Sequence, residues 1–306
     1  MERSVVAIFG PTASGKSAVA VALAQAIDGE IVSADSMQIY RGLERLTNQP
    51  TPDEQGGIPH HLVGHVEPTV SYDVSRFATD AHAAIDSILA RDRTPIVVGG
   101  SGLYLRAALA EVSFPPHVDS DERVRIAAEV ERLGPVEAHA WLTREDSDAA
   151  ARIAPTDTRR VVRALELASV GASLAPSGDD QLWTQTTRLP TRIFALQIDR
   201  ARVHAQINAR TPMLLDQGGI AEVEHLLQQP TAPSTTAARA HGVADVTRLL
   251  AGEIDRAECE RLLSVRTRQY AKRQDTWLRK LPNTEPIDAN RTIGEIAADI
   301  EAQLQR

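Results

Sequence analysis

The chain of 306 residues has little cysteine, few aromatic rings and no long apolar run. Cys259 is its only cysteine, which excludes an internal disulfide framework and a cysteine-based zinc finger and suits a reducing compartment. No segment approaches the roughly 20 apolar residues that span a bilayer, and no signal peptide precedes the first apolar run. We therefore expect a cytoplasmic protein with no membrane partner.

Aromatic residues make up only 4% of the chain. Few rings are available for a broad base-stacking platform, so recognition of nucleic acid would depend on shape, phosphate contacts and one captured base. The formal net charge of −8 also argues mildly against nucleic acid. The distribution of the charges favours an anionic macromolecule as the partner, because residues 261–280 contain seven cationic residues and only one acidic residue. A second basic group, which like the first could also be a solvated helix face, comprises Arg159, Arg160 and Arg163.

The sequence does contain a phosphate-binding pattern. Residues 10–17 read G-P-T-A-S-G-K-S, which matches G-x-x-x-x-G-K-[ST], between an apolar run at Val5–Phe9 and a helical pattern at Ala18–Ile27. A strand, glycine loop and helix in this order aim backbone N–H groups at an anionic phosphate. We expect the loop to bind a diphosphate or polyphosphate, with Lys16 adding charge and the Ser17 hydroxyl ligating Mg²⁺. The predicted diphosphate-binding residues are Gly10, Pro11, Thr12, Ala13, Ser14, Gly15, Lys16 and Ser17.

The first third of the chain alternates strand and helix patterns. Predicted strands at 5–9, 30–33, 95–98 and 191–198, with a helix at 74–89, indicate an α/β fold with a parallel sheet flanked by helices. Residues 118–171 contain no strand pattern and read as several helices. We therefore divide the chain into a core at 1–115, a helical insertion at 116–180 and the remaining core at 181–306. After Asp199 we expect only helices, including a long basic helix at 257–280.

Three predicted loops follow strands and should meet at one edge of the sheet: residues 10–17, 35–40 and 99–104. Asp35 is the only acid in them, and it is a candidate general base or metal ligand, or a cap for the following turn. The glycines around Ser101 let the backbone approach a ligand, with the Ser101 hydroxyl as a donor, or they cap a helix at Leu103.

The strand at 95–98 ends in glycines. It lacks the acid with which ATP- and GTP-hydrolysing proteins hold Mg²⁺, which argues against an ATPase and leaves Asp35 for acid–base chemistry. The histidines His60, His61 and His65 fit no common metal motif, so we expect a polar loop there.

Six segments, in order over nearly the whole chain, form a further pattern: Gly10–Ser17, Asp35–Gly42, Pro59–Leu62, Val98–Tyr104, Asp157–Glu166 and Arg268–Gln274, the last followed by Trp277. Together they resemble the tRNA dimethylallyltransferases (isopentenyl-diphosphate:tRNA transferases). The resemblance implies a P-loop NTPase-like core with an inserted all-helical domain. It also implies transfer of a dimethylallyl group from dimethylallyl diphosphate to the exocyclic amine of the adenosine 3′ of the anticodon.

The same resemblance implies roles for single residues. Asp35 accepts a proton from the amine, Lys16 stabilises the departing diphosphate, and Ser101 orients a substrate. The expected partner is the anticodon stem-loop of tRNA, the expected cofactor is Mg²⁺, and we expect a monomer. The tRNA-binding positions implied are Asp35, Ser36, Met37, Gln38, Ser101, Arg123, Arg159, Arg160, Arg163 and Arg239, the last in a segment at 239–245.

Besides Ser101, where the family usually has threonine, the chain departs from the family pattern at three places. Leu46–Pro50 lacks the lysine of the usual Gly-Thr-Ala-Lys-Pro, Ala154 stands where the family has histidine, and Gly242-Val243-Ala244 replaces Gly-Tyr-Lys/Arg. These departures affect tRNA docking more than the cleft. The alternatives are prenyl transfer to free AMP, ADP or ATP, a small-molecule kinase, and an RNA-binding protein without activity. The insertion and the basic helix favour a macromolecular acceptor.

Overall fold

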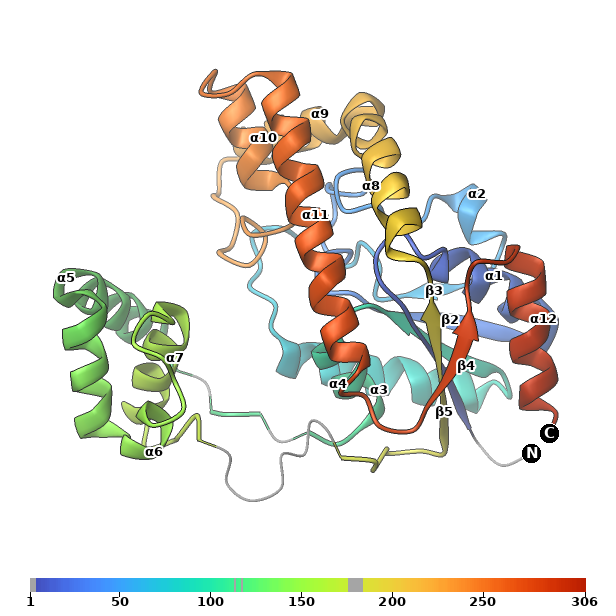
Figure 1. The fold of residues 1–306 in the computed structure, drawn as a ribbon, viewed down its shortest axis with the longest axis horizontal. Helices are drawn as coiled ribbons and strands as arrows, with labels where there is room; N and C mark the ends of the chain where they lie inside the picture. The colour runs from blue at the N-terminus through green and yellow to red at the C-terminus, as the bar shows by residue number, and fades with distance from the viewer. Residues whose placement is uncertain (1–3, 113, 117, 176–183) are drawn as a thin grey trace. The chain divides into compact units, whose positions relative to one another are not determined.

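The computed structural model describes residues 4–112, 114–116, 118–175 and 184–306. The chain forms two compact units, each visible in Figure 1. The core unit comprises residues up to 111 together with 185–306, and the inserted unit comprises residues 112–184. Within the described residues, no helix combines the length and the apolar character needed to cross a membrane.

The core unit is built on a parallel sheet of six strands in the order β3-β2-β4-β1-β5-β6. Its central strand β1 is buried along its whole length, because helices cover both faces of a parallel sheet. The predicted α/β architecture is therefore confirmed. The strands are β1 (Val5–Phe9), β2 (Gly29–Ala34), β3 (His60–His61), β4 (Thr94–Gly99), β5 (Thr191–Gln197) and β6 (Thr284–Asp288).

Helices cover the two faces of this sheet. α1 (Lys16–Ile27) and α12 (Ile293–Leu304) pack together on one face, where Leu23 and Ile300 join the apolar side chains of the strands. α3 (Val74–Ala90) and α4 (Gly102–Leu109) pack together on the other. A short helix, α2 (Pro52–Gln55), precedes β3.

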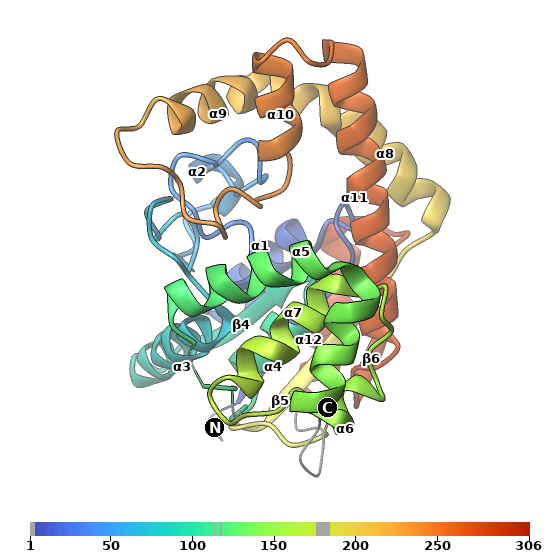
Figure 2. The ribbon, with the colours of Figure 1, turned by 90° about the vertical axis from the view of Figure 1, so that its left-hand side faces the viewer.

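A helical cluster lies beyond the carboxyl ends of the strands (Figures 1 and 2). It begins directly after β5 with α8 (Arg200–Leu214), which continues through a π-helical turn at Leu215–Gly219 into α9 (Ile220–Leu227). α10 (Val243–Leu250) and the long α11 (Arg256–Leu278) follow. Asp255 caps α11 by accepting a hydrogen bond from the Glu258 N–H. Proteins with parallel sheets bind ligands beyond the carboxyl ends of the strands, so this helical cluster covers the expected ligand site.

Two expectations about strands are wrong. The chain is not purely helical after Asp199, because β6 pairs with β5 at one sheet edge. This strand is hard to recognise, since it contains Pro286 and buries only Ile287, but an edge strand tolerates proline. His60 and His61 do not lie in a loop: they form the opposite edge strand, where His61 Nε2 lies 2.7 Å from the buried Glu30 carboxylate.

The inserted unit is helical throughout its described residues and has an apolar core of its own. Its first helix, α5 (Ser120–Glu145), bends where Gly134 adopts a positive φ of 76° immediately before Pro135. α6 (Ser147–Ala150) and α7 (Thr158–Ala168) follow, and Asp157 caps α7 by accepting from the Arg160 N–H. The helices bury Ile126, Leu142 and Leu165 between them.

Candidate active site

The phosphate-binding pattern forms a tight loop between β1 and α1. Ala13 and Gly15 both adopt positive φ angles, of 62° and 79°, the left-handed backbone conformation that tight anion-binding turns use. A Cβ at Gly10 would lie 2.7 Å from Ser14 Oγ and 3.1 Å from Leu196 Cβ, so any larger residue there would displace its neighbours. Ser14 Oγ is buried and has no hydrogen-bond partner among the described residues. A tight loop at the N-terminus of α1 with an unsatisfied hydroxyl suits an anionic ligand.

Two cations meet this loop. Lys16 Nζ lies 3.5 Å from the Pro11 carbonyl oxygen, and Arg210 of α8 donates a hydrogen bond of 2.9 Å to Thr12 Oγ1. Burial is the main cause that lowers the pKa of Lys16 to about 8; the Asp35 carboxylate opposes this shift and the Arg210 charge adds to it. Burial also lowers the pKa of Arg210. An anion placed between two desolvated cations stabilises both of their charges, and a diphosphate would be such an anion.

Helix α11 closes the loop from the other side. The side chain of Gln274 is fully buried, and its Oε1 accepts a hydrogen bond of 2.7 Å from the Thr12 N–H. Its Nε2 lies against Gly100, where a Cβ would approach it to 2.1 Å and the Gly10 carbonyl oxygen to 2.8 Å. Only glycine at position 100 therefore lets α11, the phosphate loop and the segment after β4 meet.

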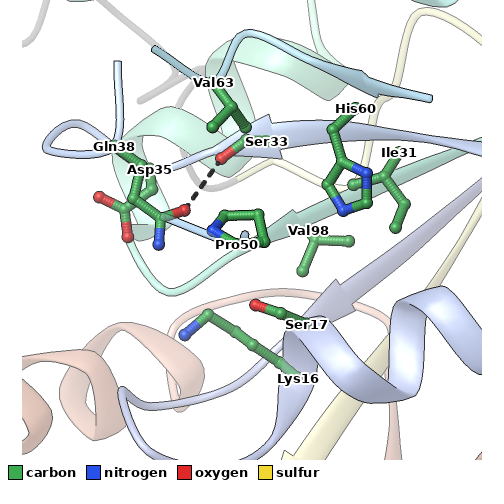
Figure 3. A pocket seen from close by; sticks show the side chains of 10 residues that line it. All are labelled: Lys16, Ser17, Ile31, Ser33, Asp35, Gln38, Pro50, His60, Val63 and Val98. Carbon is green, nitrogen blue, oxygen red and sulfur yellow. Dashed lines mark hydrogen bonds between the residues drawn. The ribbon is translucent and has the colours of Figure 1, made fainter. Parts of the chain in front are cut away.

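Asp35 follows β2 and faces the phosphate loop across an open pocket of about 350 Å³. Its Oδ1 accepts a hydrogen bond of 2.8 Å from the Met37 N–H, so the carboxylate caps the next turn and also lines the pocket. Figure 3 shows Lys16 and Ser17 on one side of the pocket and Asp35 and Gln38 on the other. The remaining lining is Ser33, His60 and the apolar Ile31, Pro50, Val63 and Val98.

The other predicted cleft residues lie at the same sheet edge but do not line this pocket. Ser36 and Met37 form the turn after Asp35. Ser101 is buried at the first turn of α4, and its hydroxyl makes no capping hydrogen bond to that helix. The loops are joined directly, since the Gly10 N–H donates to the Gly99 carbonyl oxygen at 3.3 Å.

The arginines predicted to bind tRNA differ in their surroundings. In the inserted unit, Arg123 and Arg163 both pair with the buried Glu166, at 3.4 and 2.9 Å. Arg160 lies 3.5 Å from Asp157, whereas the exposed Arg159 has no ion pair among the described residues.

In the core unit, Arg239 is exposed in the segment before α10. Asp245, in the first turn of α10, is buried and pairs with Arg266 of α11 at 2.8 Å. Its carboxylate therefore holds α10 against α11.

Sequence reasoning missed Arg210 and Gln274 as site residues. Arg210 lies in an ordinary helical pattern, and its sequence separation of 198 residues from Thr12 leaves no local signal. Gln274 ends one of the motifs that carry the family resemblance, but no spacing rule shows that it contacts the phosphate loop.

Known proteins resemble this chain over most of its length. The sequence matches the family described as IPP transferase over residues 38–281 and that described as Isopentenyl transferase over residues 3–60. It is 42% identical over 288 residues to a tRNA dimethylallyltransferase of Salinispora tropica, covering 94% of this chain and 88% of that protein. It is 44% identical over 276 residues to one of Anaeromyxobacter dehalogenans, covering 90% and 92%.

Solved structures show the same likeness. The tRNA delta(2)-isopentenylpyrophosphate transferase of Staphylococcus epidermidis superposes with a TM-score of 0.72 at 29% identity, covering 99% of this chain and 98% of that one. A eukaryotic dimethylallyltransferase acting on tRNA superposes with a TM-score of 0.77 at 25% identity, covering 99% and 78%. The chain therefore belongs to the IPP transferase family of tRNA dimethylallyltransferases.

Proposed function

We propose that this chain transfers a dimethylallyl group from dimethylallyl diphosphate to the exocyclic amine of the adenosine 3′ of the anticodon in tRNA. One observation carries the proposal. A phosphate loop with two desolvated cations faces a single carboxylate, Asp35, across a pocket with an apolar wall. The loop suits a diphosphate, the apolar wall suits an isoprenoid, and the carboxylate suits an amine that must lose a proton.

The reaction breaks the bond between C1 of the dimethylallyl group and the diphosphate oxygen, which departs with the electron pair. A bond forms between C1 and the adenine nitrogen, and Asp35 takes the proton that this nitrogen releases. Lys16, Arg210 and the loop N–H groups stabilise the charge that develops on the diphosphate. An aryl amine is a weak nucleophile, so a positioned carboxylate beside it assists the attack.

We propose Mg²⁺ as the cofactor. The described residues contain no cluster of three or more His, Cys, Asp or Glu side chains that could hold a metal alone. Ser17 and Asp35 nevertheless line one pocket and offer oxygen donors, and Mg²⁺ favours a few protein oxygens combined with substrate phosphates and water. When bound, the ion would neutralise diphosphate charge, and Ser17 would hold it.

A tRNA acceptor is supported by the names of the relatives and by the exposed Arg159 and Arg239. Extruding one base costs a few kcal/mol in a duplex and less in a single-stranded loop, which favours the anticodon loop. The monomeric state and the cytoplasmic location stay predictions; the buried Cys259 and a tRNA substrate are consistent with that location.

The test is incubation with labelled dimethylallyl diphosphate and either bulk tRNA or AMP, followed by nucleoside analysis. We expect label on one adenosine of the tRNA, at the position 3′ of the anticodon, and none on AMP. Label on AMP alone would identify an adenylate prenyltransferase. Absence of label on both, with Mg²⁺ present, would contradict prenyl transfer.

A further inference from the structure

A carboxylate of α9 binds the backbone of a segment that lies 177 residues earlier in the chain. Glu222 Oε1 accepts a hydrogen bond of 2.6 Å from the Arg45 N–H, and Glu222 Oε2 accepts one of 2.9 Å from the Leu46 N–H. Figure 2 shows α9 beside the segment that precedes α2. Burial is the main cause that raises the pKa of Glu222, and the two N–H donors oppose that rise.

The segment bound by Glu222 is a compact turn over residues 43–49. The Thr47, Asn48 and Gln49 N–H groups donate to carbonyl oxygens earlier in the turn, of residues 43, 45 and 44 respectively. The N–H groups at the start of the turn donate to no carbonyl oxygen within it. The N–H groups of Arg45 and Leu46 donate to the Glu222 carboxylate instead. Glu222 thus acts on the turn as a capping residue acts on a helix, but from a distant element.

Apolar packing fixes the same turn. The buried Leu46 lies against Gly242, where a Cβ would approach Leu46 Cδ1 to 2.8 Å and where the backbone has a positive φ of 91°. The hydrogen bonds of Glu222 and the close approach of Gly242 therefore bind the turn to the helical cluster at two points.

The turn supports one wall of the active-site pocket. Gln38 Nε2 donates to the Asn48 carbonyl oxygen at 2.5 Å, and the buried Gln49 donates from its Nε2 to the Tyr40 carbonyl oxygen at 2.8 Å. Gln38 and the adjoining Pro50 both line the pocket, and Figure 3 shows Gln38 beside Asp35, opposite Lys16 and Ser17. A shift of the turn would move this wall and leave the phosphate loop in place.

We propose that Glu222 is a positioning residue for the acceptor side of the reaction. It keeps the pocket wall that contains Gln38 at a fixed position relative to Asp35. The acceptor purine therefore binds to a surface that is already formed. The inference rests on the proposed function, because it assigns the Lys16 side of the pocket to the diphosphate and the Asp35 side to the purine. Glu222 touches neither substrate and acts only through the turn at 43–49.

The test compares Glu222→Gln and Glu222→Ala with Glu224→Gln, an exposed glutamate on the same helix. KM is measured separately for tRNA and for dimethylallyl diphosphate. We expect Glu222→Ala to raise the KM for tRNA about tenfold, with a smaller rise for Glu222→Gln, which keeps one accepting oxygen. The KM for the donor should rise by a smaller factor than the KM for tRNA in every variant, because Pro50 is the one apolar lining residue next to the turn and no hydrogen bond joins the described phosphate loop to the turn.

Hydrogen exchange supplies a readout without catalysis. The amides of Arg45 and Leu46 should exchange faster in Glu222→Ala than in the wild type and stay unchanged in Glu224→Gln. Unchanged exchange, or an equal rise in both KM values, would overturn the proposal. If the wild-type enzyme transfers no label to tRNA, the proposed function is refuted. In that case the rates of amide exchange in residues 38–50 of the Glu222 variants still show whether Glu222 holds the pocket wall in place. Thermal unfolding of each variant shows that the comparison is made on folded protein.

Discussion

At the scale of single residues, the pocket depends on two ionisable groups held in different ways. Lys16 is partly desolvated beside Arg210, and this lowers its pKa to about 8. Asp35 is held by the Met37 N–H, which fixes the direction of the carboxylate without removing it from the pocket. The capping and the catalytic interpretations of Asp35 are therefore compatible, since one oxygen accepts the backbone bond and the group still lines the pocket.

We expect Asp35→Ala to lower single-turnover transfer by about 10²-fold or more and to leave tRNA binding nearly intact, because it removes the proton acceptor. Asp35→Asn is the matched variant. Its amide oxygen can still accept from the Met37 N–H, but it takes no proton, so it should be as slow as the alanine variant. Wild-type rates in Asp35→Asn would show that the residue only caps the turn.

The lowered pKa of Lys16 predicts a pH dependence. Lys16 is charged below about pH 8 and loses its proton as the pH rises through that value. In the free enzyme kcat/KM for the donor should therefore fall above about pH 8, approaching about tenfold per pH unit. Lys16→Arg keeps its charge over this range, so its residual activity should lack this decline. A flat wild-type profile between pH 7 and 9 would contradict this role of Lys16.

At the scale of elements, α11 is not the uniform basic surface that its composition indicates. Arg261 pairs with Glu258 on its own helix, and Arg266 pairs with the buried Asp245 of α10. One helical turn from its end, Gln274 binds the phosphate loop. The helix α11 thus binds α10 through Arg266 and the phosphate loop through Gln274. Some of its arginines therefore have a structural role.

The contact between α11 and Gly100 leads to a prediction for this element. Gly100→Ala would place a Cβ within 2.1 Å of Gln274 Nε2. We expect a loss of about 1–3 kcal/mol in the free energy of unfolding and a higher KM for the donor, as Gln274 moves away from the Thr12 N–H. Gly294→Ala in α12 is the control, because apart from the adjacent residues and the backbone of α12 itself no described atom lies within 4 Å of its Cβ position. Similar chemical unfolding curves and donor KM values for the two variants would refute this view of α11.

At the scale of the whole molecule, the core unit contains the candidate active site, and the inserted unit is a separate helical body with its own core. A net charge of −8 makes long-range attraction of tRNA by the whole chain unfavourable. For the proposed binding of tRNA we therefore expect local clusters of cations to supply the attraction, and the arginines of the inserted unit to matter more than the total charge.

We expect tRNA affinity to fall steeply with salt. Arg159→Ala and Arg160→Ala should each weaken binding and reduce the slope of log affinity against log salt by about one. Arg132→Ala is a suitable control, since Arg132 is exposed on the same unit and pairs with Glu129. Filter binding between low and moderate salt measures the slopes. A salt-independent affinity, or an equal effect of Arg132→Ala, would favour a nucleotide-sized acceptor.

Local patterns were sufficient for much of this protein. The strand, loop and helix around Lys16 are predictable because the phosphate loop is a contiguous motif, and the helices of the inserted unit follow from local periodicity. The edge strand β6 escaped prediction because an edge strand buries one side chain, Ile287, and so leaves little periodicity to read. The two-residue strand β3 is too short to show any period.

The sequence by itself determined the parallel α/β core, the helical insertion, the phosphate loop and the single acid near it. Each of these depends on neighbouring residues or on an ordered set of motifs. Only the tertiary structure decided that Arg210 and Gln274 complete the phosphate loop and that Glu222 holds the opposite wall. These contacts join residues 176 to 262 positions apart, and they form because folding packs the helical cluster onto the carboxyl edge of the sheet.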